Sequence, residues 1–216
     1  MSHPYWPLFD LEVRTPRLTL RYIDDALACD LAALAAEGIH DPGWMPFASP
    51  WSNASSPDLE RKALQFFWRC RADTSPESWN INFAVLADDT VVGTSGLSST
   101  DFGRMRQFET GSWLGRAYQG KGIGKEMRLA TLTLGFTGFG AEFATTGAWH
   151  DNGPSLGVTR SLGYTESGSR RALRNDEAPD RLIGFEMSRT HFDGHVRRDD
   201  VELVGVEAVR ELLGLA

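Results

Sequence analysis

The six residues from Gln119 to Gly124, with the sequence QGKGIG, constrain this chain most strongly. They follow an aromatic and apolar run over 108–114 and precede a helical pattern that extends to about Phe136. The first N–H groups of a helix have no partner inside it, and the helix dipole adds partial positive charge at the same end. Glycines let an anion approach the backbone and allow positive φ. We therefore expect a strand, a phosphate-binding turn and a helix in this order.

Two common phosphate-binding motifs do not fit this stretch. A Walker-type loop needs a Ser or Thr after its lysine to hold magnesium, but Lys125 is followed by Glu126. A dinucleotide-binding turn needs Gly-x-Gly-x-x-Gly and an acidic residue about 20 positions later. The glycines here are spaced Gly-x-Gly-x-Gly, and no suitable acid follows the helix. Hydrolysis of nucleoside triphosphates and binding of dinucleotides are therefore disfavoured.

Composition and charge disfavour several further classes of function. The 216 residues carry 22 basic and 29 acidic side chains, a net charge of −7, which argues against nonspecific binding of nucleic acid. No apolar run approaches the roughly 20 residues of a membrane span, and the N-terminal residues lack the pattern of a signal peptide. Cys29 and Cys70 are far apart in sequence, and no His or Cys cluster has metal-ligand spacing. We expect a cytoplasmic protein with reduced thiols that binds no metal, membrane or nucleic acid.

Hydrophobic periodicity predicts one mixed α/β domain. Strands are predicted near 18–22, 79–86, 91–98, 108–114, 143–149, 164–167, 182–189 and 201–206. Helices are predicted near 26–37, from Asp58 onward with Phe66 and Phe67 toward the core, and near 123–136, 154–162 and 207–213. We expect a central, mixed but mostly antiparallel twisted sheet flanked by helices. The domain should cover 11–190, with an extension over 191–216 that packs on the domain or on a partner subunit. The second alternative would make the protein a homo-oligomer.

Three separate segments resemble one protein family. The first reads RTPRLTLR over 14–21, the second joins ETGSWL over 109–114 to the glycine turn, and the third joins DNGPS over 151–155 to SLGY over 161–164. In this order they resemble the RimJ/RimL-like branch of the GNAT acyltransferase superfamily over roughly 11–190. The resemblance implies acyl-CoA as cofactor, a small-molecule amine or a protein N-terminus as acceptor, and direct attack without an enzyme nucleophile. Relatives that share the residues at 45–47 and 111–114 are associated with succinyl donors, so acetyl-CoA and succinyl-CoA are both candidate donors.

The resemblance also assigns roles to individual positions. Residues 112–114 are similar to the strand that pairs with pantetheine, and the amide of Leu114 is the expected oxyanion donor. Asn152 would bond pantetheine, and Ser155 is the candidate acid for the departing thiolate because Thr159 stands where the family usually has a tyrosine. Satisfying local N–H groups in the first turn of a helix is the alternative for Ser155. The expected cofactor set is Ser112, Trp113, Leu114, Gln119, Gly120, Lys121, Gly122, Ile123, Gly124, Lys125, Asn152 and Ser155.

The acceptor side is less constrained by motifs. Glu109 precedes the turn in register with Gly111 and Trp113, so a partly desolvated Glu109 is the candidate general base. A surface or ion-paired glutamate is the alternative, and Asp101 and His150 are lesser candidates. The expected acceptor wall is aromatic and apolar and consists of Trp44, Met45, Phe47 and Trp51, although a plug of the core would have the same composition.

A basic cluster after Tyr164 contains Arg170, Arg171 and Arg174. These side chains could bind an acyl carboxylate, the acceptor or the adenosine phosphate, while a solvated loop is the simpler interpretation. Taken together, the sequence predicts an acyl-CoA-dependent N-acyltransferase. The alternative is a noncatalytic CoA-binding sensor or interaction module. It is favoured by Thr159, which stands where the family usually has a tyrosine.

Overall fold

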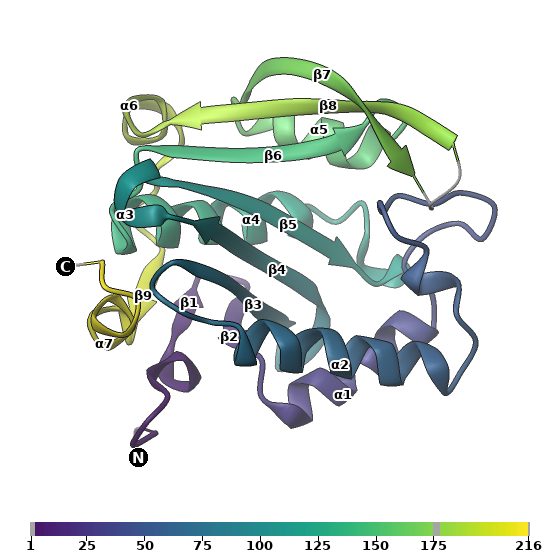
Figure 1. Cartoon of the computed structure of the whole chain (residues 1–216), viewed down its shortest axis with the longest axis horizontal. Helices are drawn as coiled ribbons and strands as arrows, with labels where there is room; N and C mark the ends of the chain where they lie inside the picture. The colour runs from purple at the N-terminus through teal and green to yellow at the C-terminus, as the bar shows by residue number, and fades with distance from the viewer. Residues whose placement is uncertain (1–2, 175–177, 216) are drawn as a thin grey trace.

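The computed structural model describes residues 3–174 and 178–215, and it confirms a mixed α/β fold around one open sheet (Figure 1). Within these residues nine strands form the sheet in the order β7-β8-β6-β5-β4-β3-β2-β1-β9. The strands are β1 (Glu12–Arg14), β2 (Thr19–Tyr22), β3 (Ser78–Ala87), β4 (Thr90–Thr100), β5 (Gln107–Leu114), β6 (Phe143–Trp149), β7 (Thr165–Arg174), β8 (Ala178–Ser188) and β9 (Glu202–Val204). The helices are α1 (Asp25–Ala36), α2 (Asp58–Ala72), α3 (Phe102–Met105), α4 (Ile123–Thr133), α5 (Gly153–Ser161), α6 (Arg189–His191) and α7 (Val206–Leu212).

One parallel pair interrupts the antiparallel sheet. Strands β5 and β6 run in the same direction, which requires a crossover, and α4 provides it. The pairing covers only 107–109 with 143–145, although β5 continues to Leu114 and β6 to Trp149. The two strands therefore separate, and a split opens in the sheet where α4 begins.

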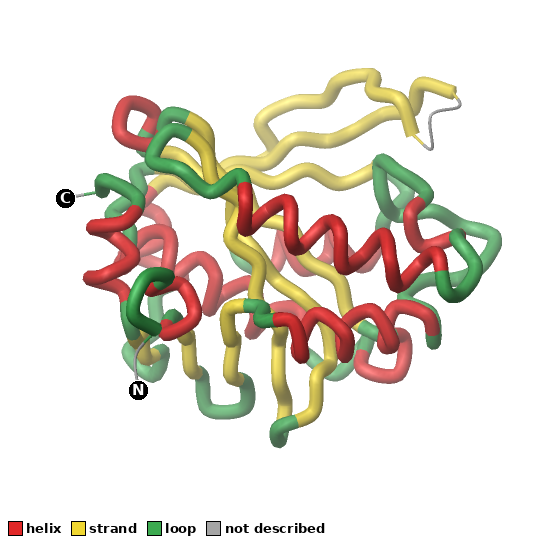
Figure 2. Tube along the Cα trace, turned by 60° about the horizontal axis from the view of Figure 1, so that its bottom comes forward, coloured by secondary structure: helices red, strands yellow, loops and turns green. Residues whose placement is uncertain are grey.

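Helices cover both faces of the sheet (Figures 1 and 2). On one face α1 and α2 pack through a core that contains Leu31 and Phe67. On the other face α4 and α5 pack through a larger core that contains Phe108, Met127 and Leu156. The split between β5 and β6 thus lies between two helical layers, and each layer can contribute side chains to it.

Most predicted elements are confirmed, and the differences have simple causes. Strand β1 was not predicted because three residues are too few to show a period, and the one-turn helix α3 replaces the turn expected over 103–106. Strand β7 continues past the predicted 164–167 and strand β8 begins before the predicted 182–189, because the added residues are mostly polar and exposed and carry no hydrophobic alternation. Phe66 was predicted to face the core but is 42% exposed. One residue corresponds to about 100° of helix, so Phe66 and Phe67 face different directions.

The residues from His191 onward continue the same sheet and core. Strand β9 pairs with β1, and Phe192, Val209 and Leu213 are buried in the larger core. Among the described residues, no helix is both long and apolar enough to cross a bilayer. Pairing of the 201–206 segment with a second subunit stays a prediction.

Candidate active site

The split exposes one edge of the β5 backbone. Gly115 N–H donates to Val92 O in the β4–β5 ladder. Because antiparallel partners alternate, the N–H groups of Thr110, Ser112 and Leu114 then point away from β4 and toward β6. The last bridge to β6, between Glu109 and Thr145, uses the Thr110 N–H, so the N–H groups of Ser112 and Leu114 have no ladder partner on β6. An extended molecule can therefore pair with this edge as an additional strand would.

The glycine turn closes one end of this edge. Gly120 and Gly122 have φ of +74° and +80°, which glycine adopts without a steric penalty. Gly122 is the N-cap of α4, and no side chain caps the helix, so its first N–H groups are available to an anion. Gln119 Nε2 fixes the turn by donating to Leu114 O at 3.0 Å and to Ile39 O at 2.9 Å.

An arginine to which the sequence analysis gave no role lies beside the turn. Arg17 donates to Glu126 through Nε at 2.6 Å and to Lys121 O through Nη1. Its Nη2 is 3.5 Å from the place that a Cβ at Gly122 would occupy. Burial raises the pKa of Glu126, but hydrogen bonds from Thr15 and Arg17 and the charge of Arg17 outweigh burial, so the pKa is lowered. Glu126 is therefore ionised, and the charge of Arg17 neutralises it, which limits the repulsion between Glu126 and an anion at the turn.

A cavity of about 1180 Å³ joins the split to the α1–α2 side of the sheet. Its lining includes many of the residues predicted for cofactor and catalysis: Glu109, Ser112, Trp113, Leu114, Gln119, Gly124, Asn152 and Ser155. Four residues of the glycine turn and the first turn of α4 are exposed and do not line the cavity: Gly120, Lys121, Gly122 and Lys125. The side chain of Ile123 is buried in the core, so only its backbone can contact a cofactor.

Helix α5 borders the cavity on the β6 side. Asn152 Oδ1 accepts a hydrogen bond from Ser155 N–H at 3.1 Å and caps the helix. The Asn152 and Ser155 side chains are half-buried and line the cavity, so capping does not remove them from it. Thr159 is fully buried and is not among the lining residues. Ser155 is therefore better placed than Thr159 to meet a thiolate.

A buried arginine lies at the closed end of the split. Arg128 of α4 is 5% exposed and lines the cavity. Its Nη1 donates to Thr110 Oγ1 at 3.2 Å and to Thr146 Oγ1 at 3.3 Å, and its Nη2 donates to Ser112 Oγ at 3.0 Å. No carboxylate of the described residues lies within ion-pair distance of this guanidinium. Arg128 was not predicted as a site residue because a basic residue in an amphipathic helix usually faces solvent.

Arg174 fixes the aromatic loop at the mouth of the cavity. Its Nε donates to Met45 O at 2.9 Å, and its Nη1 lies 3.0 Å from Asp151 and 2.8 Å from Asp180. Trp44 Nε1 donates to Asp151 Oδ2 at 2.8 Å. The expectation of a solvated loop was wrong for Arg174, which belongs to β7 and has only 11% of its side chain exposed.

The predicted acceptor wall is only partly correct. Trp44 and Phe47 line the cavity, together with Trp51, whose ring centroid lies 6.1 Å from that of Trp113. Met45 is 6% exposed and is not among the lining residues. Its contribution is the carbonyl that Arg174 holds, because the side chain turns into the protein.

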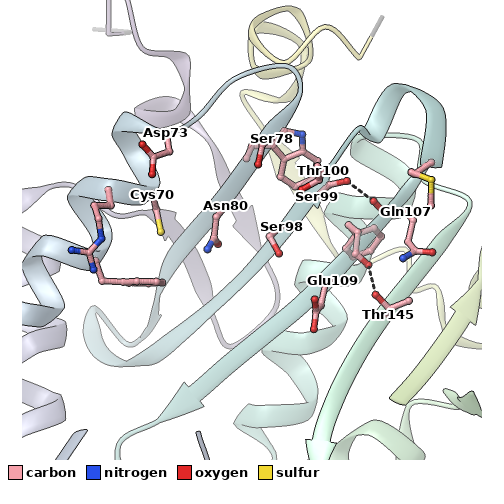
Figure 3. Close-up of a pocket in the computed structure, with 15 residues that line it drawn as sticks. Cys70, Asp73, Ser78, Asn80, Ser98, Ser99, Thr100, Gln107, Glu109 and Thr145 are labelled. Carbon is pink, nitrogen blue, oxygen red and sulfur yellow. Dashed lines mark hydrogen bonds between the residues drawn. The ribbon is translucent and has the colours of Figure 1, made fainter. Parts of the chain in front are cut away.

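A second, polar hollow of about 580 Å³ continues from the cavity across β3, β4 and β5 (Figure 3). Asn80, Ser98 and Glu109 line both spaces, so Glu109 lies where they meet. Glu109 is exposed, and the partial desolvation expected for a general base is therefore not present in the chain alone. The alternative bases Asp101 and His150 line neither space.

The family follows from comparison with known proteins. A family model described as an acetyltransferase (GNAT) domain matches residues 17–165. Similar solved structures include ribosomal-protein-S5-alanine acetyltransferase from Vibrio fischeri, with 18% identity, a TM-score of 0.65, and coverage of 88% of this chain and 100% of that chain. A GNAT-family acetyltransferase from Bacillus anthracis has 16% identity, a TM-score of 0.67, and coverage of 83% and 99%. RimL, a ribosomal L7/L12 α-N-protein acetyltransferase in complex with coenzyme A, has 16% identity, a TM-score of 0.64, and coverage of 81% and 95%.

At these identities the solved structures show a shared fold, and that fold agrees with the RimJ/RimL-like resemblance of the sequence. The family model covers well over half of the 216 residues. This chain therefore belongs to the GNAT acetyltransferase family.

Proposed function

We propose that the protein transfers an acyl group from coenzyme A to a primary amine within a ternary complex. The observation that supports this most is the unpaired edge of β5, which runs from the glycine turn to Glu109. A diphosphate bound at the turn and an extended arm paired with this edge would bring a thioester into the cavity. An amine that enters from the opposite helical layer would meet it there, and such positioning can supply much of the rate enhancement.

The chemical step needs no enzyme nucleophile and no metal. The amine nitrogen forms a bond to the thioester carbonyl carbon, the carbon–sulfur bond breaks, and an amide and free CoA result. Glu109 accepts the proton that the amine loses, directly or through water, and Ser155 is the candidate donor to the departing thiolate. The amide of Leu114 was the expected oxyanion donor, but the amide of Ser112 faces the split in the same way and lies farther from the turn. We therefore add Ser112 as the better candidate for the oxyanion, with Leu114 bonding the arm.

The polar hollow favours an elongated acceptor, such as a protein N-terminus, over a small amine. It extends the cavity beyond Glu109 along β3 to β5, and its hydroxyl, amide and carboxylate side chains suit the polar backbone of an extended peptide. Solved structures of similar fold are named for acting on ribosomal proteins, which agrees with this choice. The free thiols Cys29 and Cys70 suit the reducing cytoplasm.

A donor and acceptor panel tests the proposal. The protein is incubated with acetyl-CoA or succinyl-CoA and with small amines or short peptides that have free N-termini, and thiol release is followed. We expect turnover with peptides, and Ser155→Ala should lower kcat by about 10-fold or more while leaving the Kd of CoA unchanged. Ser161→Ala, an exposed serine on the same helix, is the matched control. Binding of CoA without turnover for any donor or acceptor would instead support the noncatalytic sensor.

A further inference from the structure

We infer that Arg128 binds a carboxylate at the far end of the donor's acyl chain, so that the preferred donor is an ω-carboxyacyl-CoA of about the length of succinyl-CoA. This inference rests on the proposed function, because it assigns the acyl-binding end of the same site. It selects between donors that the glycine turn cannot distinguish, since all CoA thioesters share the same diphosphate.

Among the described residues, no opposite charge compensates that of Arg128. An arginine stays protonated in proteins, and a buried charge is costly unless an opposite charge pairs with it. The groups that bond the Arg128 guanidinium are all hydroxyls: Thr110, Thr146 and Ser112. The nearby phenol of Tyr164 supplies no anion either, because burial raises its pKa. The protein thus holds a cation in place and leaves its counterion to be supplied from outside.

Part of the hydrogen-bonding capacity of the Arg128 guanidinium is unused. A guanidinium has five N–H donors, and Arg128 uses three of them, two on Nη1 and one on Nη2. Its Nε–H has no partner among the described residues. The Nε–H and one Nη2 N–H of a guanidinium are parallel, and this pair is the fork that binds both oxygens of a carboxylate. The hydroxyls therefore fix the side chain and leave the Nε–H without an acceptor, and because this Nε is buried a carboxylate reaches the edge only when neighbouring side chains move.

Arg128 lies at the closed end of the split. Thr110 and Thr146 are the first residues after the last paired positions of β5 and β6. Thr146 Oγ1 also donates to Thr110 O at 3.0 Å, so a side chain closes the split where backbone pairing ends. An arm that enters from the glycine turn runs toward this closed end, and an acyl chain that continues past the thioester reaches the guanidinium. The acetyl group ends earlier and would leave the charge unpaired.

A purely structural role for Arg128 explains fewer observations. A cross-link between Thr110, Thr146 and Ser112 needs hydrogen-bond donors but no charge, and a buried charge without a counterion is a poor stabiliser. The cross-link also does not account for the place of Arg128 among the residues that line the cavity. The transfer itself is unchanged: the proximal carbonyl carbon passes from sulfur to nitrogen, and the distal carboxylate keeps its bond and its charge.

Binding measurements on the native chain provide the test. Isothermal titration calorimetry compares CoA, acetyl-CoA, butyryl-CoA and succinyl-CoA; butyryl and succinyl chains have the same number of carbons and differ at the far end. We expect succinyl-CoA to bind at least 10-fold more tightly than butyryl-CoA. Arg128→Met, which keeps an unbranched chain without the charge, should remove this preference while free CoA still binds. Arg128→Lys should retain only part of it, because an ammonium has no fork.

The outcomes separate this inference from the proposed function. Equal affinity of the native protein for succinyl-CoA and butyryl-CoA would overturn the role of Arg128 and leave acyl transfer intact. A preference for succinyl-CoA that persists in Arg128→Met would overturn it as well. So would an Arg128→Met variant that binds acetyl-CoA and succinyl-CoA more weakly than the native protein by the same factor. Failure of every CoA species to bind the folded native protein would overturn the proposed function itself. Far-UV circular dichroism checks the fold of each variant, and the comparison within the native protein does not depend on any variant.

Discussion

The donor side and the acceptor side of the cavity are built in different ways. Most of the donor side comes from a short stretch of chain, because the exposed edge of β5, the glycine turn and Arg128 lie between 109 and 128, and Arg17, Asn152 and Ser155 add to it from elsewhere. The acceptor side brings together the aromatic loop, α2, β3 and β7, which are far apart in sequence. Local backbone geometry therefore makes most of the donor site, while long-range ion pairs and packing make the acceptor site. Substitutions on the two sides should separate into donor effects and acceptor effects.

The largest effect is expected for Gly122→Val. A Cβ at φ of +80° is strained, and a β-branched residue there would reorganise the turn. Loss of charge-assisted bonds from two or three amides should lower kcat/KM for the donor by about 100-fold or more. Calorimetry with CoA and steady-state kinetics measure this change, and the KM of the acceptor should be nearly unaffected.

Gly103→Val is the control for a general effect of adding a side chain. A Cβ at Gly103 meets nothing within 4 Å and its φ is not in the left-handed region. If Gly122→Val binds CoA as tightly as the native protein, the diphosphate does not bind at the turn, and the contrast between the two sides loses its basis.

Glu109→Gln should separate chemistry from binding. Glutamine keeps the shape of the side chain but cannot accept the proton, so kcat should fall by about 100-fold. The Kd of CoA should not change, because the Glu109 side chain lies on one face of β5, whereas Thr110 and Ser112, which contact Arg128 on the donor side, project from the other face. Glu186→Gln is the matched control, since Glu186 is an exposed glutamate on β8 that lines neither hollow. An unchanged kcat for Glu109→Gln over the whole pH range would remove it as the base.

Arg174→Met should affect the acceptor side alone. It leaves Asp151 and Asp180 without their cation and releases the carbonyl of Met45. We expect the acceptor KM to rise by about 10-fold and the free energy of unfolding to fall by about 3 kcal/mol. Chemical denaturation and acceptor titrations measure both, and Arg171→Met is the control because Arg171 is exposed on the same strand. An equal rise in the Kd of CoA would show that the two sides are not independent.

The donor side could be predicted from the sequence because its signals are local. Glycines at 120 and 122 specify a backbone conformation, and the run over 108–114 specifies the strand before it. The family model then confirmed the family. Arg128 was missed because its function depends on the separation of β5 from β6, and no local pattern records where two strands stop pairing.

The acceptor side could be predicted only in outline. The aromatic composition of 44–51 indicated a wall, but the inward turn of Met45 depends on Arg174, which lies 129 residues away. The exposure of Phe66 and the polar hollow likewise depend on how α2 lies over β3 and β4. Contacts of this kind are set by tertiary packing, and a single sequence carries little information about them.

The smallest effect concerns Glu126, the acid beside the glycine turn. Its pKa is lowered in the folded protein, so its contribution to stability is complete above the pKa of an unfolded glutamate, about 4.3, and is lost as the pH falls through the folded value. Glu126→Gln should lower the free energy of unfolding at pH 7 by about 1 kcal/mol and flatten its decline on the acid side of pH 4.3. Urea denaturation between pH 3 and 7 measures this, with Glu207→Gln as the control because Glu207 is an exposed acid in the first turn of α7. The Kd of CoA at pH 7 should change by less than about 3-fold, since Arg17 already neutralises the carboxylate. A large tightening of CoA binding in Glu126→Gln would mean that this neutralisation is incomplete and that the donor side depends on long-range charge as well as on local backbone geometry.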